Sequence, residues 1–179
     1  MSVCLWRISP SHSTMNLIGE YPVSMDDKGR LRMPASLLRQ LPTPLSEESG
    51  FEFVVNRGFE KCLTMYPKTV WDTLSAKINR LNRFNNRNRM FIRAFYQGAS
   101  HTATDSAGRI LVQKPLLDYA GITNEALLLA MDDRIEIWAP DQYNNLVIDP
   151  EQFSDLSDQV LGGGDDGVGD MDFFDDKSF

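Results

Sequence analysis

Two short stretches of the sequence could each present a fixed positive charge to a ligand. Asp26-Asp27-Lys28-Gly29-Arg30 and Asp105-Ser106-Ala107-Gly108-Arg109 both place an aspartate four residues before an arginine, with glycine directly before the arginine. A carboxylate in this position can accept hydrogen bonds from the guanidinium and so fix its orientation. An oriented guanidinium is well suited to bind phosphate, so both stretches are candidate contacts for nucleic acid.

The residues around each arginine favour a turn between two strands over a helix. A spacing of four residues also permits a helical Asp–Arg pair. However, Leu31 and Met33 alternate with other residues after the first arginine, and Ile110 and Val112 do so after the second. This alternation is typical of a strand, and glycine supplies the positive φ that a tight turn needs.

The residues of the two turns have two expected roles. The candidate DNA-binding residues are Arg30, Arg109, Lys28 and Arg32. The residues expected to shape the turns and orient the arginines are Asp26, Asp105, Gly29 and Gly108. Alternation along a strand places Arg30 and Arg32 on one face and Leu31 on the other.

The similarity between the two stretches continues along the chain. Ala35-Ser36-Leu37-Leu38 corresponds to Lys114-Pro115-Leu116-Leu117, and Met65-Tyr66-Pro67 corresponds to Ile137-Trp138-Ala139-Pro140. Two matched series in the same order indicate an internal repeat. The sequence therefore predicts two tandem units of one fold.

With these features, the sequence resembles the MraZ family, whose tandem units each carry an Asp-x-x-x-Arg signature within the AbrB-like class of DNA-binding folds. The matching residues are Asp26 with Arg30 and Asp105 with Arg109. The resemblance runs from about residue 15 to residue 143. It includes these further residues: Tyr66-Pro67, Trp71, Gly98 and Ala120-Gly121-Ile122.

The resemblance implies both a fold and a function. The fold is mainly β (α+β) with helices, in which two tandem AbrB-like swapped-hairpin units form an intrachain pseudo-dimeric barrel. The function is that of a sequence-specific transcriptional regulator, which binds repeated boxes of double-stranded DNA upstream of the division and cell-wall gene cluster. Members of this family resemble one another in forming homo-oligomeric rings, so several Arg-bearing loops would engage several boxes together.

The second unit departs from the family pattern in two places. Gln113-Lys114-Pro115 stands where proline commonly follows sooner, and Asp118 stands where the first unit has Arg39. Both changes are expected to weaken DNA binding by the second unit. We therefore expect Arg30 to contribute more than Arg109.

Composition divides the chain into four parts. Residues 15–97 are the expected first unit with a helical connection, and residues 98–148 are the expected second unit. Residues 1–14 show no periodicity and are expected to be a disordered leader. Residues 149–179 are expected to be a disordered acidic tail, because they hold ten acidic residues and a single basic one. The net charge of −7 therefore arises in the tail and does not argue against DNA binding elsewhere.

Periodicity predicts the elements that position these residues. Residues 67–81 and 87–96 have the apolar spacing of amphipathic helices, and shorter helices are predicted at 35–41, 115–119 and 141–148. The residues of the second long helix expected to face the core are Met90, Phe91, Ala94 and Phe95. Strands are predicted at residues 20–25, 31–33, 51–56, 62–66, 101–105, 109–112, 126–131 and 134–138. The strands flanking each Asp–Arg turn are expected to pair as a hairpin.

Basic residues gather on the two long helices. No acidic residue occurs from residue 73 to residue 104, and six basic residues create a positive field there: Lys77, Arg80, Arg83, Arg87, Arg89 and Arg93. This cluster is open to three interpretations: a solvated helix face, a surface that meets an acidic patch of a neighbouring subunit, or a direct DNA contact.

Residues for catalysis or metal binding are not arranged in any recognised pattern. His12 and His101 lie near no suitable Cys or Ser, and the segment of residues 162–167 matches no calcium loop. Cys4 and Cys62 lack metal spacing, which favours a reducing cytosol. We expect no enzyme activity, cofactor, metal, small-molecule substrate or membrane segment, and a cytoplasmic, nucleoid-associated protein.

Two alternative functions involve a protein partner in place of DNA. The chain could form a structural ring whose basic face binds an acidic protein. It could also be an AbrB-like antitoxin whose tail wraps a toxin. The positions of Arg30 and Arg109 favour DNA over both.

Overall fold

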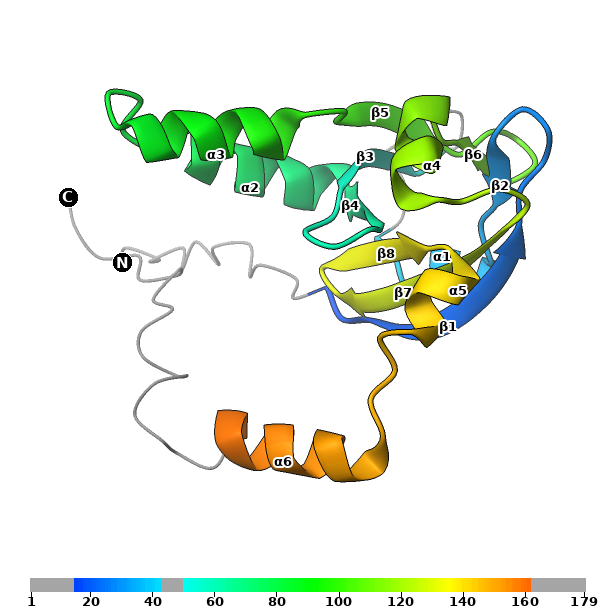
Figure 1. Cartoon of the computed structure of the whole chain (residues 1–179). Helices are drawn as coiled ribbons and strands as arrows, with labels where there is room; N and C mark the ends of the chain where they lie inside the picture. The colour runs from blue at the N-terminus through cyan, green and yellow to red at the C-terminus, as the bar shows by residue number, and fades with distance from the viewer. Residues whose placement is uncertain (1–14, 43–49, 162–179) are drawn as a thin grey trace, which may run out of the picture. The chain divides into compact units, whose positions relative to one another are not determined.

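The structure is a computed structural model that describes residues 15–42 and 50–161 (Figure 1). The predicted leader, residues 1–14, and the part of the predicted tail after residue 161 lie outside the described residues. Among the described residues, those up to Tyr143 pack as one unit, and those from Asn144 to Leu161 belong to a second unit.

A six-stranded antiparallel sheet forms the body of the first unit. Its strands follow the order β1 (Leu17–Ser24), β7 (Glu125–Asp132), β8 (Arg134–Trp138), β4 (Leu63–Pro67), β3 (Glu52–Arg57) and β5 (Ser100–Ala103). Strands β1–β4 belong to the first half of the repeat and β5–β8 to the second half. From either edge of the sheet, the order is therefore the first strand of one half followed by the third and fourth strands of the other half. The first strand of each half pairs with the third of the other half, β1 with β7 and β5 with β3.

A separate two-stranded ladder joins the residues that follow the two Asp–Arg turns. Strand β2 (Arg30–Arg32) pairs antiparallel with β6 (Arg109–Leu111). The expected hairpins are therefore wrong, because only the bridge between Met25 and Leu31 joins β2 to the end of the preceding strand. Pairing across the halves sets Leu31 opposite Ile110, and both side chains are fully buried. A hairpin within one half would not bring these two apolar residues together.

Six helices connect or follow the strands in the described part of the chain. They are α1 (Ala35–Leu38), α2 (Lys68–Asn79), α3 (Asn86–Tyr96), α4 (Lys114–Ala120), α5 (Pro140–Asn144) and α6 (Pro150–Leu161). Helix α4 ends at Gly121, whose φ of 69° is favourable for a residue without a side chain. The mixed fold with a mainly antiparallel sheet agrees with the prediction. No described helix has the length and apolar character needed to cross a membrane.

Both halves of the repeat contribute to one hydrophobic core. Leu31 and Leu37 from the first half pack in the same cluster as Ile110 and Leu116 from the second. A smaller cluster around Trp71 attaches α2 and α3 to the sheet, and its ring stacks on Phe95 at 5.2 Å between centroids. The two repeated units of the sequence therefore share a single main hydrophobic core and do not form two separate ones.

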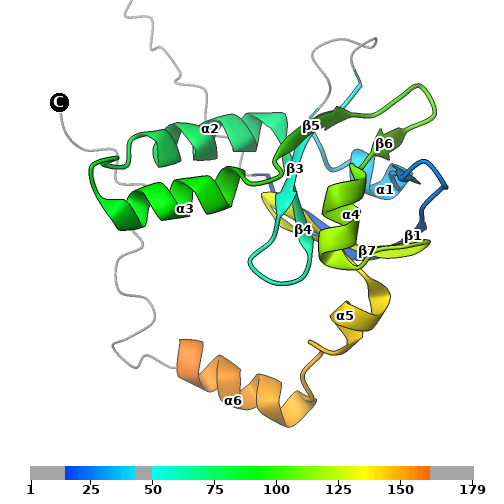
Figure 2. The same cartoon turned by 45° about the horizontal axis from the view of Figure 1, so that its top comes forward.

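Helix α3 turns a different face to the core from the one expected. Of the four residues predicted to face inward, only Phe95 packs in a cluster, whereas Met90 is 60% exposed, Phe91 is 42% exposed and Ala94 is also exposed. Helices α2 and α3 lie side by side and project from the sheet (Figures 1 and 2). The main core therefore does not reach the outer face of α3.

Helix α6 replaces part of the expected disordered tail. Its first turn is capped by Asp149, whose Oδ1 accepts a hydrogen bond from the Gln152 amide at 2.8 Å. Pro150 stands at the first helical position, where proline is favoured. The prediction of disorder relied on the acidic composition of this segment. It overlooked the three- and four-residue spacing of Phe153, Leu156 and Val160, which indicates an amphipathic helix.

Candidate nucleic-acid interface

Three hydrogen bonds and one ion pair, all to the carboxylate of Asp26, shape the first Asp–Arg turn and hold its arginine. Asp26 Oδ1 accepts from the backbone amides of Lys28 and Arg30, both at 2.9 Å. Asp26 Oδ2 accepts a hydrogen bond from Arg30 Nε at 2.8 Å, and Arg30 Nη2 forms an ion pair with the same oxygen at 2.8 Å. The turn itself is closed by the Gly29 amide, which donates to the Asp26 carbonyl.

The second turn repeats this geometry. Asp105 Oδ1 accepts from the amides of Ala107 and Arg109 at 2.9 Å. Asp105 Oδ2 accepts a hydrogen bond from Arg109 Nε at 2.9 Å, and Arg109 Nη2 forms an ion pair with the same oxygen at 2.8 Å. The predicted role of Asp26 and Asp105 as partners of the arginines agrees with these contacts. Since each guanidinium is held by its Nε–Nη2 edge, its Nη1 side points away from the carboxylate.

The β2–β6 ladder places both arginines on one exposed face. Residues opposite each other in an antiparallel pair point to the same side. Arg30 stands opposite Leu111, and Arg32 stands opposite Arg109, while Leu31 and Ile110 point to the core. We call this outward face the arginine ladder, and it consists of Arg30, Arg32, Arg109 and Leu111.

The two halves of the arginine ladder are not equivalent. Arg32 in the first half corresponds to Leu111 in the second, which is 51% exposed, and Lys28 corresponds to Ala107. Lys28 is exposed in the turn. The first turn and β2 therefore supply three cations together, whereas the second turn and β6 supply only one. Alignment of the two turns in the sequence already shows Ala107 in place of Lys28 and Leu111 in place of Arg32. Only the strand register shows that Leu111 shares a face with the arginines.

Electrostatic coupling extends across the ladder. Hydrogen bonds from the Arg109 side chain, followed by those from backbone amides, lower the pKa of Asp105 to about 2. The pKa of Asp26 is also lowered, chiefly by the backbone amide of Arg30. The pKa of Arg109 is raised, first by Asp105 and additionally by the charge of Asp26 in the other turn. The turns are thus close enough for their charges to interact.

The hydrogen bonds that Asp105 accepts in the second turn are expected to be lost only below about pH 4, when its carboxylate is protonated. Because the folded-state pKa of Asp105 lies below its usual value of 3.8, the stabilisation from its hydrogen bonds is complete above that pH and is lost as the pH falls towards 2. A carbon-13 NMR titration should give a midpoint for Asp105 near 2. In the Arg109→Ala variant the midpoint should rise towards 3.8. A wild-type midpoint near 3.8 would contradict the ion pair.

The two turn glycines offer a matched test of the packing behind the ladder. Both have positive φ, 76° at Gly29 and 70° at Gly108. An added Cβ at Gly29 would stand 2.9 Å from the backbone oxygen of Val112, whereas at Gly108 the nearest atom is Leu38 Cδ1 at 3.9 Å. Gly108→Ala should cost about 1–2 kcal/mol of folding free energy for the left-handed conformation. Gly29→Ala should cost clearly more, as measured by urea denaturation. Equal costs would contradict this close approach.

The basic cluster predicted on the long helices lies away from the arginine ladder, on the α2–α3 hairpin (Figure 2). Two of its arginines have structural roles there. Arg89 Nη1 donates to the carbonyls of Arg83 and Phe84, both at 2.9 Å, and Arg83 Nη2 donates to Asn79 Oδ1. The cluster therefore does not extend the ladder, and it belongs to a different surface.

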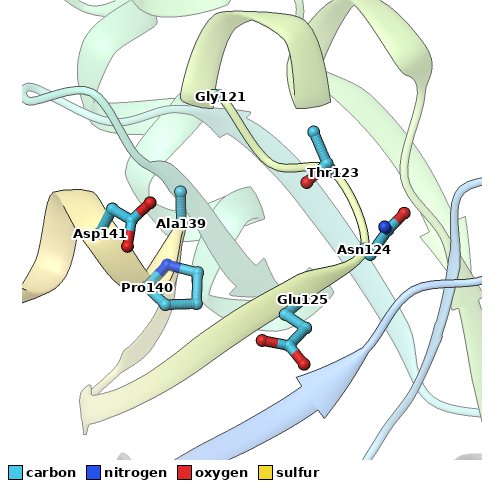
Figure 3. Close-up of a pocket in the computed structure, with 7 residues that line it drawn as sticks. All are labelled: Gly121, Thr123, Asn124, Glu125, Ala139, Pro140 and Asp141. Atoms are coloured by element: carbon cyan, nitrogen blue, oxygen red, sulfur yellow. The ribbon is translucent and has the colours of Figure 1, made fainter.

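A polar hollow of about 320 Å³ lies between the segment that joins α4 to β7 and the start of α5 (Figure 3). It is lined by Gly121, Thr123, Asn124, Glu125, Ala139, Pro140 and Asp141. Two carboxylates and no basic side chain among these residues make it unsuitable for a phosphate. Within residues 15–42 and 50–161, no group of three or more His, Cys, Asp or Glu side chains is placed to hold a metal ion.

Comparison with known proteins gives consistent results. The chain matches the family described as "MraZ protein, putative antitoxin-like" at residues 17–94 and again at residues 95–159. It is 40% identical to the transcriptional regulator MraZ of Christiangramia forsetii over 157 residues, which cover 86% of this chain and 99% of that protein. The corresponding protein of Flavobacterium psychrophilum is 39% identical over 152 residues, or 84% and 94% of the two chains. That of Clostridium acetobutylicum is 34% identical over 135 residues, or 74% and 89%.

Proposed function

The chain belongs to the MraZ family, and from that premise we propose that it is a transcriptional regulator that binds double-stranded DNA through its arginine ladder. The similar proteins are named transcriptional regulators, and this supports the regulatory role. No step of this function requires a cofactor or a catalytic residue.

The observation that carries the DNA contact is the pair of carboxylate-held guanidiniums on one exposed ladder. A two-stranded β-ribbon fits the major groove of B-DNA, and arginine is the commonest side chain to contact guanine there. Asp26 and Asp105 fix Arg30 and Arg109 before DNA arrives. Less side-chain entropy is then lost on binding, which favours affinity.

We further propose that several chains assemble into a ring that engages repeated boxes upstream of the division and cell-wall gene cluster. Each ladder contributes a modest affinity, and linkage within a ring raises the effective concentration of the others. The pairing of β1 with β7 and β5 with β3 supports an AbrB-like exchange of strands between the halves as the frame of each ladder. The protein would act in the cytoplasm, at the nucleoid.

A gel-shift titration against the DNA upstream of the protein's own gene tests the proposed function. Wild-type protein should bind this DNA more tightly than a scrambled duplex of the same length and composition. The logarithm of the binding constant should fall linearly with the logarithm of salt concentration, because phosphate contacts release counterions. Equal affinity for both duplexes at every salt concentration would reject sequence-specific binding.

The oligomer is tested separately by light scattering. At micromolar concentration the wild-type protein should have a mass several times that of one chain, which is 20.3 kDa. The physical reason is that large apolar side chains of the described residues, such as Phe84 and Met90, are exposed in one chain. A mass near 20 kDa would exclude the ring and leave DNA binding by single chains to be judged by the titration.

A protein partner is the second candidate function, and one structural observation favours it. Helix α3 exposes Met90 and Phe91, which a DNA phosphate would not cover favourably. The matched family's description also contains the word antitoxin-like. Failure of the upstream DNA to bind, together with a stable oligomer, would favour this function.

A further inference from the structure

Leu111 is an apolar residue on an otherwise positively charged surface. Its side chain is 51% exposed on the outward face of the arginine ladder, opposite Arg30. The residues before and after it, Ile110 and Val112, are buried, so the alternation of the strand is regular and directs Leu111 outward. Neither hydrophobic cluster of the described residues includes Leu111. Its apolar surface is therefore available to a ligand of the ladder.

The backbone around Leu111 is fixed at both ends of the ladder. The Val112 amide donates a hydrogen bond to the Gly29 carbonyl, and the Met33 amide donates to the Gly108 carbonyl, both at 2.9 Å. A leucine side chain also loses less rotamer freedom than an arginine when a contact immobilises it. Leu111 is thus presented from a rigid frame, and contact with it costs little conformational entropy.

The spacing of the ladder is comparable with the spacing of bases in DNA. Side chains opposite each other in an antiparallel pair have Cβ atoms about 5 Å apart, and residues two apart in one strand are separated by about 7 Å. Bases along one strand of B-DNA are about 3.4 Å apart. Leu111 therefore lies about one or two base-pair steps from the base that Arg30 would contact, and about two steps from that of Arg109.

The major groove offers one apolar group to a side chain such as leucine. Every base pair presents hydrogen-bond donors and acceptors there, and thymine adds a C5-methyl group. A leucine placed against a donor or acceptor would remove its water without replacing the hydrogen bond, at a cost in affinity. A leucine placed against the methyl group removes apolar surface of both partners from water, which is favourable. Contact with Leu111 therefore favours thymine over the other bases.

We propose that Leu111 selects a thymine beside the bases contacted by Arg30 and Arg109, by covering the C5-methyl group of that thymine. This inference rests on the proposed binding of double-stranded DNA and adds a base preference at one position of the site. The first half of the ladder has Arg32 at the corresponding position. The two halves, which share one fold, therefore read different bases.

Removal of the methyl groups from the DNA tests the proposal. A second version of the upstream duplex carries deoxyuridine in place of every thymine, which removes the C5-methyl groups and keeps the hydrogen-bonding edges of the bases. The full-length wild-type protein should bind this duplex about four-fold more weakly for each methyl group that it contacts, as expected for burial of one methyl-sized group. Both affinities are measured by gel-shift titration at one salt concentration.

The Leu111→Ala variant isolates the methyl contact from other effects of uracil. Replacement of thymine also changes the shape and stiffness of the duplex, and the variant responds to that change as the wild type does. The contact itself is given by the difference between the two proteins in their preference for the thymine duplex. This preference should be about four-fold smaller in Leu111→Ala, which should also bind the thymine duplex more weakly than the wild type does.

A matched control removes an exposed apolar side chain from outside the ladder. Ile18 lies on β1 and is 71% exposed. Ile18→Ala should keep the wild-type preference for the thymine duplex. Light scattering should give Leu111→Ala the same mass as the wild type, because Leu111 contacts DNA and not another copy of the chain.

Each outcome has one meaning for Leu111. A preference for the thymine duplex that falls in Leu111→Ala and persists in Ile18→Ala supports the methyl contact. Equal preferences in the wild type and Leu111→Ala would overturn it, and specific binding of the upstream duplex by both proteins would then leave the proposed function standing. A lower mass of Leu111→Ala would assign the residue to a contact between copies and would also overturn the proposal. Absence of specific DNA binding by the wild type would reject both the inference and the proposed function.

Discussion

Replacing Arg30 with alanine is expected to weaken binding to the upstream DNA about ten-fold or more, because one well-aligned guanidinium contact contributes roughly 1–3 kcal/mol. The Arg30 side chain is 31% exposed, lies on the outward face of the ladder and belongs to neither hydrophobic cluster. The melting temperature should therefore change little. If Arg30 contacts a phosphate, the slope of log K against log salt should also become shallower by about 0.9.

Two further variants separate orientation from charge. Arg109→Ala should weaken binding less than Arg30→Ala, since the second half of the ladder lacks the neighbouring cations Lys28 and Arg32. Asp26→Asn keeps the size of the side chain but weakens its hold on the Arg30 guanidinium. It should lower affinity although the arginine is still present. Wild-type affinity and salt slope in Arg30→Ala would show that the ladder is not the DNA contact.

The Asp–Arg turns could be predicted in detail because their chemistry is local. Asp26 and Arg30 are four residues apart, and a single glycine with positive φ lets the chain reverse between them. The hydrogen bonds that the carboxylate accepts come from residues within this interval. The spacing of residue types in the sequence was therefore enough to predict both the turn and the ion pair.

The partners of the strands could not be predicted from the same local pattern. A turn followed by alternating residues is compatible with a hairpin and with pairing to a distant strand. Leu31 gains complete burial only opposite Ile110 of the second half, and this long-range packing decides the pairing. The asymmetry of the ladder at Leu111 depends on the same register and was missed for the same reason.

The faces of the outer helices illustrate a different difficulty. Periodicity shows that α3 and α6 are amphipathic, but it does not show whether an apolar stripe is covered within its own chain. Phe95 packs against Trp71, whereas Phe91, one turn earlier, is left exposed because the core ends there. The sequence therefore predicted that α3 is a helix but not which of its faces the core covers.

Replacing Leu31 with alanine should have the largest effect on stability, with a cost of about 2–5 kcal/mol of unfolding free energy. Leu31 is fully buried and lies between Arg30 and Arg32, so it fixes β2 to the core while the arginines face outward. Leu111→Ala is the matched control, because it removes the same atoms from the same ladder but from its exposed side. That variant should change stability by no more than about 0.5 kcal/mol. Urea denaturation measures both values. Similar costs for the two variants would mean that β2 is not anchored through Leu31, and the rigid presentation of the arginines would then need another cause.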